Sequence, residues 1–152
     1  MARLALFDLD GTLSDDSERA QFFIQGQPTE YWDRDKMLAD PIFPGAFNLI
    51  RGLESVDTHI GILSARQDEL NRKVTQQWLD SFDLNPAYVI LKPKRFSYMK
   101  PEEFKCMKLA SILADDEFTD VVFYENERGV VDYINARLPG EHAQWVEWNQ
   151  TE

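Results

Sequence analysis

Residues 3–12 read RLALFDLDGT and carry the strongest structural signal in the chain. Residues 3–7 form a nearly continuous apolar run, which is typical of a strand buried on both faces of a parallel sheet. Asp8 and Asp10 follow this run directly, and Gly11 lets the backbone bend after them. In open parallel sheets ligands bind beyond the carboxyl ends of the strands, so we expect both carboxylates at a functional site.

Further strand-like segments alternate with helical patterns along the rest of the chain. We predict strands at residues 58–63, 88–91, 121–124 and 143–148, and helices at residues 67–80, 101–114 and 127–138. In the first of these helices Leu70, Val74 and Trp78 recur at helical spacing and should face the core. The alternation favours right-handed crossovers and an α/β, Rossmann-like fold, in which a mainly parallel sheet carries helices on both faces.

Length and composition indicate one compact domain. The chain has 152 residues, of which 43% are hydrophobic, and this is enough for one sizeable core. Residues 14–56, between the first two predicted strands, look helical and loop-like, with breaks near residues 26–28 and 41–45. Because this stretch is too short for an independent domain, we predict a single domain over residues 1–152 with 14–56 as a short helical cap or lid insert.

The charge balance narrows the classes of function. The 16 Lys and Arg residues face 27 Asp and Glu residues, for a net charge of −11, which argues against a broad basic face that holds a nucleic-acid duplex. One basic stretch stands out, KPKRFSYMK at residues 92–100, with the cations Lys92, Lys94, Arg95 and Lys100. We therefore expect an acidic protein with a small local basic patch.

Cysteine and histidine content limits the chemistry and the location. Cys106 is the single cysteine, so neither an internal disulfide nor a cysteine-based zinc cluster can form. With two histidines in the chain, catalysis should depend on carboxylates, hydroxyls, lysine or a metal. We find no signal peptide and no stretch as long as a membrane span. We expect a cytoplasmic protein in a reducing compartment, with no membrane partner and no obligate protein partner.

The pair Asp8 and Asp10 suits phosphoryl chemistry. One carboxylate can attack phosphorus as a nucleophile while the other gives and takes the proton. The alternative is a solvated acidic turn after an edge strand. A buried strand that ends in two aspartates followed by Gly11 and Thr12 favours the functional interpretation.

The segment DLDGT, residues 8–12, resembles the first motif of the haloacid dehalogenase (HAD) superfamily of phosphohydrolases. The resemblance implies a HAD-like fold and a Mg²⁺-dependent phosphomonoesterase that works through an aspartyl-phosphate intermediate. In that family pattern Asp8 would be the nucleophile and Asp10 the acid and base. Thr12 would support the loop of the first motif and the substrate bound there.

The segment GILSAR, residues 61–66, resembles the second motif of the same superfamily. Ser64 matches the hydroxyl residue of that motif, and its Oγ together with N–H groups of the following helix would hold phosphoryl oxygens. The alternative for Ser64 is an ordinary helix N-cap. Arg66 would bind the phosphate through two hydrogen bonds, and its alternative is a surface arginine on the first helical turn.

A lysine that neutralises the transferring phosphoryl group is expected before the fourth strand. Lys100, Lys105 and Lys108 compete for this role. Lys105 begins a predicted helix and lies 20 residues before Glu125, which matches the third motif of the superfamily. We therefore assign this catalytic role to Lys105.

Glu125 and Asn126 follow the fourth predicted strand, where the superfamily usually has two aspartates. Glu125 can still bind Mg²⁺ because hard cations prefer carboxylate oxygens. Asn126 could hold a metal-bound water but adds no charge. The expected Mg²⁺ ligands are the Asp8 carboxylate, the Asp10 backbone carbonyl and Glu125, with Asn126 beside them.

Within the superfamily, the chain most resembles the 3′-phosphatase domain of phage-type polynucleotide kinase-phosphatases. The matching segments are residues 16–19 (DSER), 31–33 (YWD), 40–42 (DPI) and 64–66 (SAR), together with Arg72, Thr75, residues 78–79 and Lys105. This resemblance implies that Arg19 binds substrate together with Thr12 and Arg66, and that the substrate is a nucleic-acid 3′-phosphate end. Two alternatives stay open: a nucleotidase or small-molecule phosphatase, and a non-catalytic HAD-like binding module, which the amide of Asn126 suggests.

Overall fold

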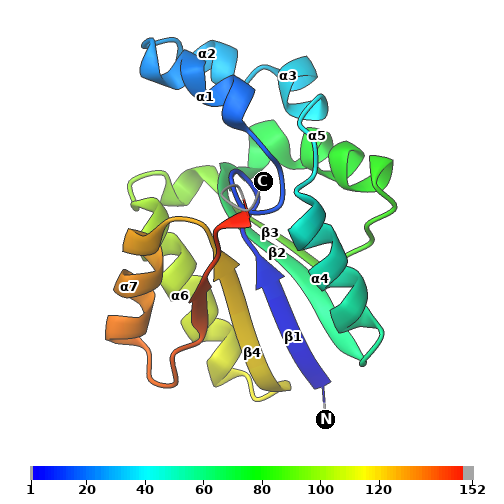
Figure 1. The fold of residues 1–152 in the computed structure, drawn as a ribbon. Helices are drawn as coiled ribbons and strands as arrows, with labels where there is room; N and C mark the ends of the chain where they lie inside the picture. The colour runs from blue at the N-terminus through cyan, green and yellow to red at the C-terminus, as the bar shows by residue number, and fades with distance from the viewer. Residues whose placement is uncertain (1, 149–152) are drawn as a thin grey trace.

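The computed structural model describes residues 2–148, and this part of the chain contains a five-stranded parallel sheet (Figure 1). Its strands follow the order β3-β2-β1-β4-β5, so the strand nearest the N-terminus lies at the centre. The strand bounds are β1 Ala2–Phe7, β2 Thr58–Gln67, β3 Tyr88–Lys92, β4 Phe118–Glu125 and β5 Ala143–Trp145. The predicted α/β, Rossmann-like fold is confirmed.

Helices cover both faces of this sheet (Figure 1). The helices that cover it are α4 Pro44–Glu54, α5 Asp68–Ser81, α6 Pro101–Ala114 and α7 Arg128–Arg137. Successive side chains of β1 point to opposite faces, as they must in a strand. Ala5 and Phe7 join the core under α4 and α5, whereas Leu4 and Leu6 join the core under α6 and α7. This two-sided burial explains the continuous apolar run before Asp8.

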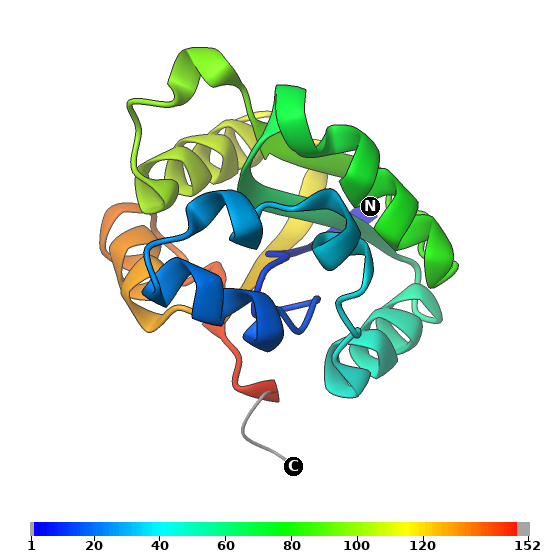
Figure 2. The same ribbon diagram turned by 90° about the horizontal axis from the view of Figure 1, so that it is seen from above.

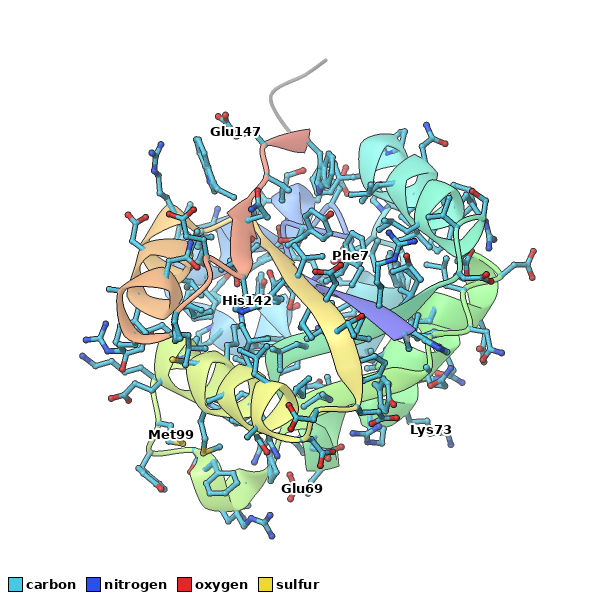
Figure 3. All side chains as sticks on the ribbon, turned by 90° about the horizontal axis from the view of Figure 1, so that it is seen from below. Phe7, Glu69, Lys73, Met99, His142 and Glu147 are labelled. Carbon is cyan, nitrogen blue, oxygen red and sulfur yellow. The ribbon has the colours of Figure 1, made fainter. Side chains whose placement is uncertain are left out.

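The view from below shows how this layering separates interior from surface (Figure 3). Phe7 is fully buried in the middle of the molecule, whereas Glu69 and Lys73 lie at its exposed periphery. Among residues 2–148, no helix combines the length and the apolar character that crossing a membrane requires.

The stretch between β1 and β2, predicted as a cap insert, contains helices of two kinds. The short helices α1 Ser17–Ile24, α2 Pro28–Tyr31 and α3 Arg34–Leu38 lie over the carboxyl end of the sheet (Figures 1 and 2). In contrast, α4 packs on the sheet itself and buries Ala46 and Ile50 in the core. The helices over the carboxyl end, residues 17–38, therefore occupy a smaller part of the chain than the 14–56 stretch that we predicted for the insert.

Two local predictions around α5 need correction. The strand β2 continues to Gln67, which pairs with Lys92 after an irregularity in the ladder, so the helix begins at Asp68. Leu70 was predicted to face the core, but its side chain is 74% exposed. The buried positions of α5 are instead Asn71, Val74, Thr75, Trp78 and Leu79. This stripe follows the i, i+3, i+4, i+7 spacing of a helix, and Leu70 lies outside it.

Candidate active site

Asp8 lies directly at the carboxyl end of β1. Its backbone N–H donates to Tyr124 O at 3.0 Å, so the pairing of β1 with β4 holds the residue in place. A tight turn follows, in which Leu9 O accepts hydrogen bonds from the backbone N–H groups of residues 12–14 at 2.9–3.0 Å. Gly11 has a φ of +87°, and a Cβ at this position would lie 2.4 Å from Asn126 Nδ2. Glycine is therefore required both by the backbone and by the close approach of Asn126.

Asp8 belongs to a buried cluster of three charges. Lys105 reaches in from α6, with its Nζ 3.0 Å from Asp8 Oδ1 and 2.6 Å from Glu125 Oε1. All three side chains are buried. Burial and the nearby Glu125 raise the pKa of Asp8 to about 7, although Lys105 opposes this shift. Burial disfavours the charge on Lys105, but Asp8 and Glu125 outweigh it and raise the pKa of the lysine.

Thr12 and Asn126 complete the surroundings of the Asp8 carboxylate. Thr12 Oγ1 donates to Asp8 Oδ2 at 3.1 Å and accepts from the Asn126 backbone N–H at 2.9 Å. In the orientation that satisfies its hydrogen bonds, the Asn126 amide nitrogen lies 3.2 Å from Asp8 Oδ2 and 3.0 Å from Glu125 Oε2. Asp8, Glu125 and Asn126 therefore meet around one point.

This donor set suits a hard divalent cation. Two buried carboxylates share the single cation of Lys105, which leaves the cluster one positive charge short. Residues 2–148 hold no group of three or more His, Cys, Asp or Glu side chains arranged as a metal site. Magnesium is commonly held by one or two carboxylates together with waters and substrate phosphate. Oxygens of this kind are available on the Asp8 and Glu125 carboxylates and on the Asp10 backbone carbonyl. The Asn126 side chain offers one more when its amide is rotated by 180°, so that the oxygen faces the two carboxylates.

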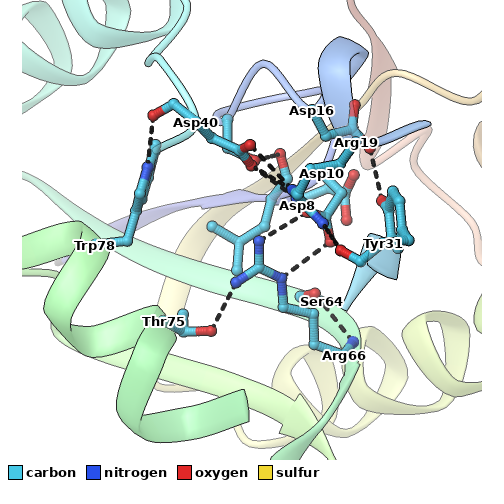
Figure 4. A network of polar contacts seen from close by, with 12 residues as sticks. Asp8, Asp10, Asp16, Arg19, Tyr31, Asp40, Ser64, Arg66, Thr75 and Trp78 are labelled. Atoms are coloured by element: carbon cyan, nitrogen blue, oxygen red, sulfur yellow. Dashed lines mark hydrogen bonds and ion pairs between the residues drawn. The ribbon is translucent and has the colours of Figure 1, made fainter. Parts of the chain in front are cut away.

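The second aspartate, Asp10, has very different neighbours (Figure 4). Arg66 donates from Nε to Asp10 Oδ2 at 3.0 Å and from Nη2 to Oδ1 at 2.7 Å, while Arg19 Nη2 lies 2.6 Å from Oδ1. Burial works to raise the pKa of Asp10, but Arg66 and Arg19 outweigh it and lower this pKa to about 2. Asp10 is therefore an ionised carboxylate held by two guanidinium groups.

Both arginines are buried and are held by further groups. Arg19 also donates from Nε and Nη2 to the Asp40 carboxylate at 2.7–3.1 Å, and from Nη1 to Tyr31 O at 2.9 Å. Arg66 donates from Nη1 to Thr75 Oγ1 at 2.9 Å. With 4% of its surface exposed, Arg66 is not the surface arginine that we considered as an alternative.

Ser64 is buried in β2, and its Oγ accepts the backbone N–H of Arg66 at 3.1 Å (Figure 4). The helix that follows Ser64 begins at Asp68, because β2 continues to Gln67. The alternative that Ser64 caps this helix fails for this reason. The carboxyl end of β2 therefore presents Ser64 as part of an extended strand.

The predicted site residues fall into two adjoining groups. The first group surrounds the end of β1 and consists of Asp8, Thr12, Lys105, Glu125 and Asn126. The second group consists of Asp10, Arg19 and Arg66, with Ser64 beside Arg66. Of the three competing lysines, Lys105 is the one that reaches Asp8.

Asp40 and Thr75, which fix the two arginines, were among the residues that match the family but were not predicted as site residues. Asp40 lies 21 positions from Arg19, so no local spacing links the two. The signal for both was the resemblance, which gave neither residue a role.

No protein-family model and no curated protein sequence matches the chain. Among solved structures, it is similar to a chain of the Pnkp1/Rnl/Hen1 RNA repair complex, with a TM-score of 0.69 and 15% identity over 96% of this chain. A second structure of the Pnkp1/Rnl/Hen1 complex gives a TM-score of 0.68 and 16% identity, again over 96% of this chain. The chain spans less than half of these two proteins, 42% and 46% of their lengths.

A haloacid dehalogenase-like hydrolase from Streptococcus pneumoniae is also similar, with a TM-score of 0.60 and 13% identity over 89% of this chain and 80% of that one. A protein from Clostridium acetobutylicum described as a predicted phosphatase gives a TM-score of 0.54 and 13% identity, over 82% of this chain and 76% of that one. At such identities the likeness concerns the fold. The chain has the HAD-like fold that the first sequence motif implied.

Proposed function

We propose that the protein is a Mg²⁺-dependent phosphomonoesterase that works through an aspartyl-phosphate intermediate. The observation that carries this proposal is the Asp8 carboxylate at the end of the central strand, with Lys105 at one oxygen and Thr12 at the other. A nucleophile needs to be fixed in place and to have positive charge beside the group that it attacks. The HAD-like fold supports the same proposal.

In the first step, a carboxylate oxygen of Asp8 attacks phosphorus and forms the new P–O bond. The bond from phosphorus to the ester oxygen breaks, and its electron pair stays on the leaving oxygen, which takes a proton from Asp10. In the second step, water attacks phosphorus while Asp10 accepts a proton from it. The bond between phosphorus and Asp8 breaks, and inorganic phosphate leaves with both aspartates restored.

Arg19 and Arg66 control when Asp10 can act as an acid in this cycle. Without substrate, Arg19 and Arg66 hold Asp10 as a carboxylate. A phosphoryl group that arrives beside Asp10 competes for the same guanidinium groups, because arginine binds phosphate and carboxylate with the same paired geometry. Once these groups turn toward phosphate oxygens, the Asp10 carboxylate takes up a proton from water before the first step, and this is the proton that it gives to the leaving oxygen. Ser64 and Lys105 would hold the remaining phosphoryl oxygens.

Magnesium would be held by the Asp8 and Glu125 carboxylates, the Asp10 backbone carbonyl and the Asn126 amide oxygen. When bound, it supplies positive charge to the transferring phosphoryl group. Its two positive charges would also exceed the one that the cluster of Lys105 and two buried carboxylates lacks, which leaves positive charge for the phosphoryl group. These oxygens match the preference of a small hard cation.

We propose nucleic-acid 3′-phosphate ends as the substrate. Support comes from the likeness to chains of an RNA repair complex, although this chain spans less than half of their lengths. The short cap over the carboxyl end of the sheet is also consistent with access for a polymer end (Figure 2). A nucleotide or another small phosphate ester is the second candidate, which the net charge of −11 favours.

The experiment that tests this function is a phosphate-release assay with 3′- and 5′-phosphorylated oligonucleotides, mononucleotides and 2-phosphoglycerol, each with Mg²⁺. Asp8→Asn should lower turnover at least about a thousandfold while the protein stays folded, because the amide cannot attack phosphorus. The matched control is Asp15→Asn, since the Asp15 carboxylate accepts a hydrogen bond from the Ser17 backbone N–H and lies outside the site. Comparable turnover by the wild type and Asp8→Asn would exclude the mechanism.

A further inference from the structure

A cavity of about 900 Å³ lies beside the candidate active site, between the cap helices and α5. Ala65 lines one part of it and lies between Ser64 and Arg66 in β2, so the cavity borders the same strand end as the proposed phosphate site, on the side to which Ala65 points. Asp8, Asp10 and Lys105 do not line it, which means that it holds something other than the reacting phosphoryl group. Binding sites for small molecules have volumes of roughly 300–1,000 Å³, and this cavity falls at the upper end.

We propose that this cavity binds the terminal nucleoside that carries the phosphate. The face of the base would stack on Trp32, and the edge of the base would form hydrogen bonds with Asn71. The proposal rests on the proposed phosphatase function and names the part of the protein that recognises the substrate. Three features of the cavity wall support it: an aromatic ring, an unpaired amide and a surplus of cations.

The aromatic ring is that of Trp32, which follows α2 in the cap and is 38% exposed. The ring packs edge-on against Tyr31, with the ring centroids 4.7 Å apart and the planes at 88°. Tyr31 is itself buried and donates its hydroxyl to Asp16 Oδ2 at 2.6 Å, so Trp32 rests on a fixed support. Exposed aromatic rings next to a phosphate site are the usual platforms on which bases of single-stranded nucleic acids stack.

The unpaired amide belongs to Asn71 on α5. This residue is 6% exposed and lines the cavity, and its amide makes no hydrogen bond to another residue within 2–148, while its polar atoms stay open to solvent in the cavity. Water in the cavity can therefore satisfy this amide, and a ligand that replaces the water can use it. An amide offers a donor and an acceptor side by side, which pairs with the donor and acceptor on the edge of a base.

The surplus of cations comes from Arg34, Lys73 and Lys92, which all line the cavity. The one carboxylate among the lining residues, Glu69, shares the Lys94 backbone N–H between its two oxygens, at 2.9 and 3.2 Å, and keeps its negative charge. Lys92 also donates to Met99 O at 2.9 Å, and Arg34 donates to Gln77 Oε1. The lining therefore has a net surplus of two cations in a protein with a net charge of −11, which favours an anion in the cavity other than the reacting phosphate. The phosphodiester on the far side of the terminal nucleoside is such an anion. A sugar monophosphate has no second phosphate to place there, so the cavity favours a polynucleotide end.

Steady-state kinetics test this proposal with three substrates: a 3′-phosphorylated dinucleotide, the same dinucleotide with an abasic terminal residue, and 2-phosphoglycerol, which has no ring to stack. Trp32→Ala should raise KM for the intact dinucleotide roughly tenfold to a hundredfold, the range expected for one stacked base. Asn71→Leu, which keeps the volume but removes the amide, should raise the same KM. Both variants should leave the abasic dinucleotide and 2-phosphoglycerol within about twofold of the wild type.

The matched control is Phe23→Ala. Phe23 is an exposed aromatic residue of α1 that packs edge-on against Tyr31, as Trp32 does, but it does not line the cavity. If Trp32→Ala acted by loosening the cap, Phe23→Ala would have the same effect. Equal effects of the two variants, or equal effects of Trp32→Ala on the intact and abasic dinucleotides, would overturn the proposal.

A binding measurement separates this inference from the phosphatase function itself. The 3′-phosphorylated dinucleotide is titrated into the Asp8→Asn variant while tryptophan fluorescence is followed, with inorganic phosphate as the comparison. We expect the dinucleotide to bind at least about tenfold more tightly than phosphate and to quench fluorescence, and the quenching should be lost with Trp32→Ala. If the wild type hydrolyses no phosphate ester, the proposed function fails and this titration alone decides the cavity. No advantage of the dinucleotide over phosphate would overturn the cavity assignment.

Discussion

Asp8 and Asp10 are two residues apart, yet the molecule surrounds them with different charge balances. Around Asp8, two buried carboxylates share the single ammonium of Lys105. Around Asp10, the guanidinium groups of Arg19 and Arg66 both point at one carboxylate, and Asp40 pairs with Arg19 as well. Burial and Glu125 raise the pKa of Asp8 to about 7, whereas burial of Asp10 is outweighed by Arg66 and Arg19, which lower its pKa to about 2. The comparison indicates that the Asp8 side lacks one positive charge, whereas the Asp10 side is balanced and can receive an anion only when Arg19 or Arg66 releases a carboxylate.

The largest effect is expected from Lys105→Met, which removes the only cation of the Asp8 cluster. Leaving two buried carboxylates without a partner should lower the free energy of unfolding by about 3–5 kcal/mol, and phosphatase activity should be lost. Urea unfolding monitored by circular dichroism measures the first, and phosphate release the second. Lys108→Met on the same helix is the matched control and should change neither. The double variant Lys105→Met/Glu125→Gln should recover part of the lost stability but none of the activity; if it recovers no stability, the charge argument fails.

The next largest effect is expected on the Asp10 side. Arg66→Ala removes the group that holds Asp10 through two hydrogen bonds and that we expect to hold the phosphate. Loss of one such donor should lower kcat/KM by about a hundredfold or more. The control is Arg72→Ala, because Arg72 is an exposed arginine of α5 that pairs with Asp68. An Arg66→Ala enzyme with wild-type kinetics would mean that Asp10 does not need this partner.

The metal requirement further tests the difference between the surroundings of Asp8 and those of Asp10. Glu125→Ala should raise the Mg²⁺ concentration for half-maximal activity strongly, by about tenfold or more, and Asn126→Ala should raise it less. A carboxylate contributes a full charge to the cation, whereas an amide contributes only a dipole. Activity measured against Mg²⁺ concentration in both variants, with a chelator as the zero point, provides the comparison. If only Asn126→Ala shifts the curve, our assignment of Glu125 as a ligand is wrong.

The smallest effect is expected farthest from the two aspartates. Lys94 and Arg95 are exposed residues in the loop after β3. Neutralising both should raise KM for a long 3′-phosphorylated oligonucleotide a few-fold, and the effect should fade at high salt because these contacts release counterions. KM for 2-phosphoglycerol should stay unchanged. Equal changes for both substrates would remove the basic loop from substrate binding.

The charge contrast also shows what could be predicted from the sequence and what could not. The apolar run of β1 followed by two aspartates predicted a buried strand with a site at its end, because burial on both faces leaves a continuous local pattern. The spacing of Lys105 and Glu125, read with the resemblance to the HAD superfamily, predicted two of the residues that the structure brings to Asp8. The first prediction depended on a short local run of residues, and the second depended on the order and spacing of family motifs.

The surroundings of Asp10 could be predicted only in part. The family resemblance named Arg19 and Arg66 as substrate-binding residues, but it did not place them on Asp10. Arg66 and Asp10 are 56 positions apart and Arg19 and Asp40 are 21 apart, and charged side chains are usually exposed. Only the folded chain shows that α1, the loop before α4 and the end of β2 bring these four residues together (Figure 4). The exposed position of Leu70 has a similar reason, since periodicity alone did not distinguish it from the buried stripe of α5.

Asp8 should form the covalent bond to phosphorus, and rapid acid quench with a ³²P-labelled 3′-phosphorylated oligonucleotide tests this most directly. The wild type should carry label on the protein during turnover, and the label should be stable to acid and released by alkali, as expected for an acyl phosphate. Asp10→Asn should both form and lose the label more slowly, because Asp10 serves as the acid in the first step and as the base in the second. Asp8→Asn should carry none. Label on the Asp8→Asn protein, or full turnover with no labelled protein at any time in the wild type, would contradict the account.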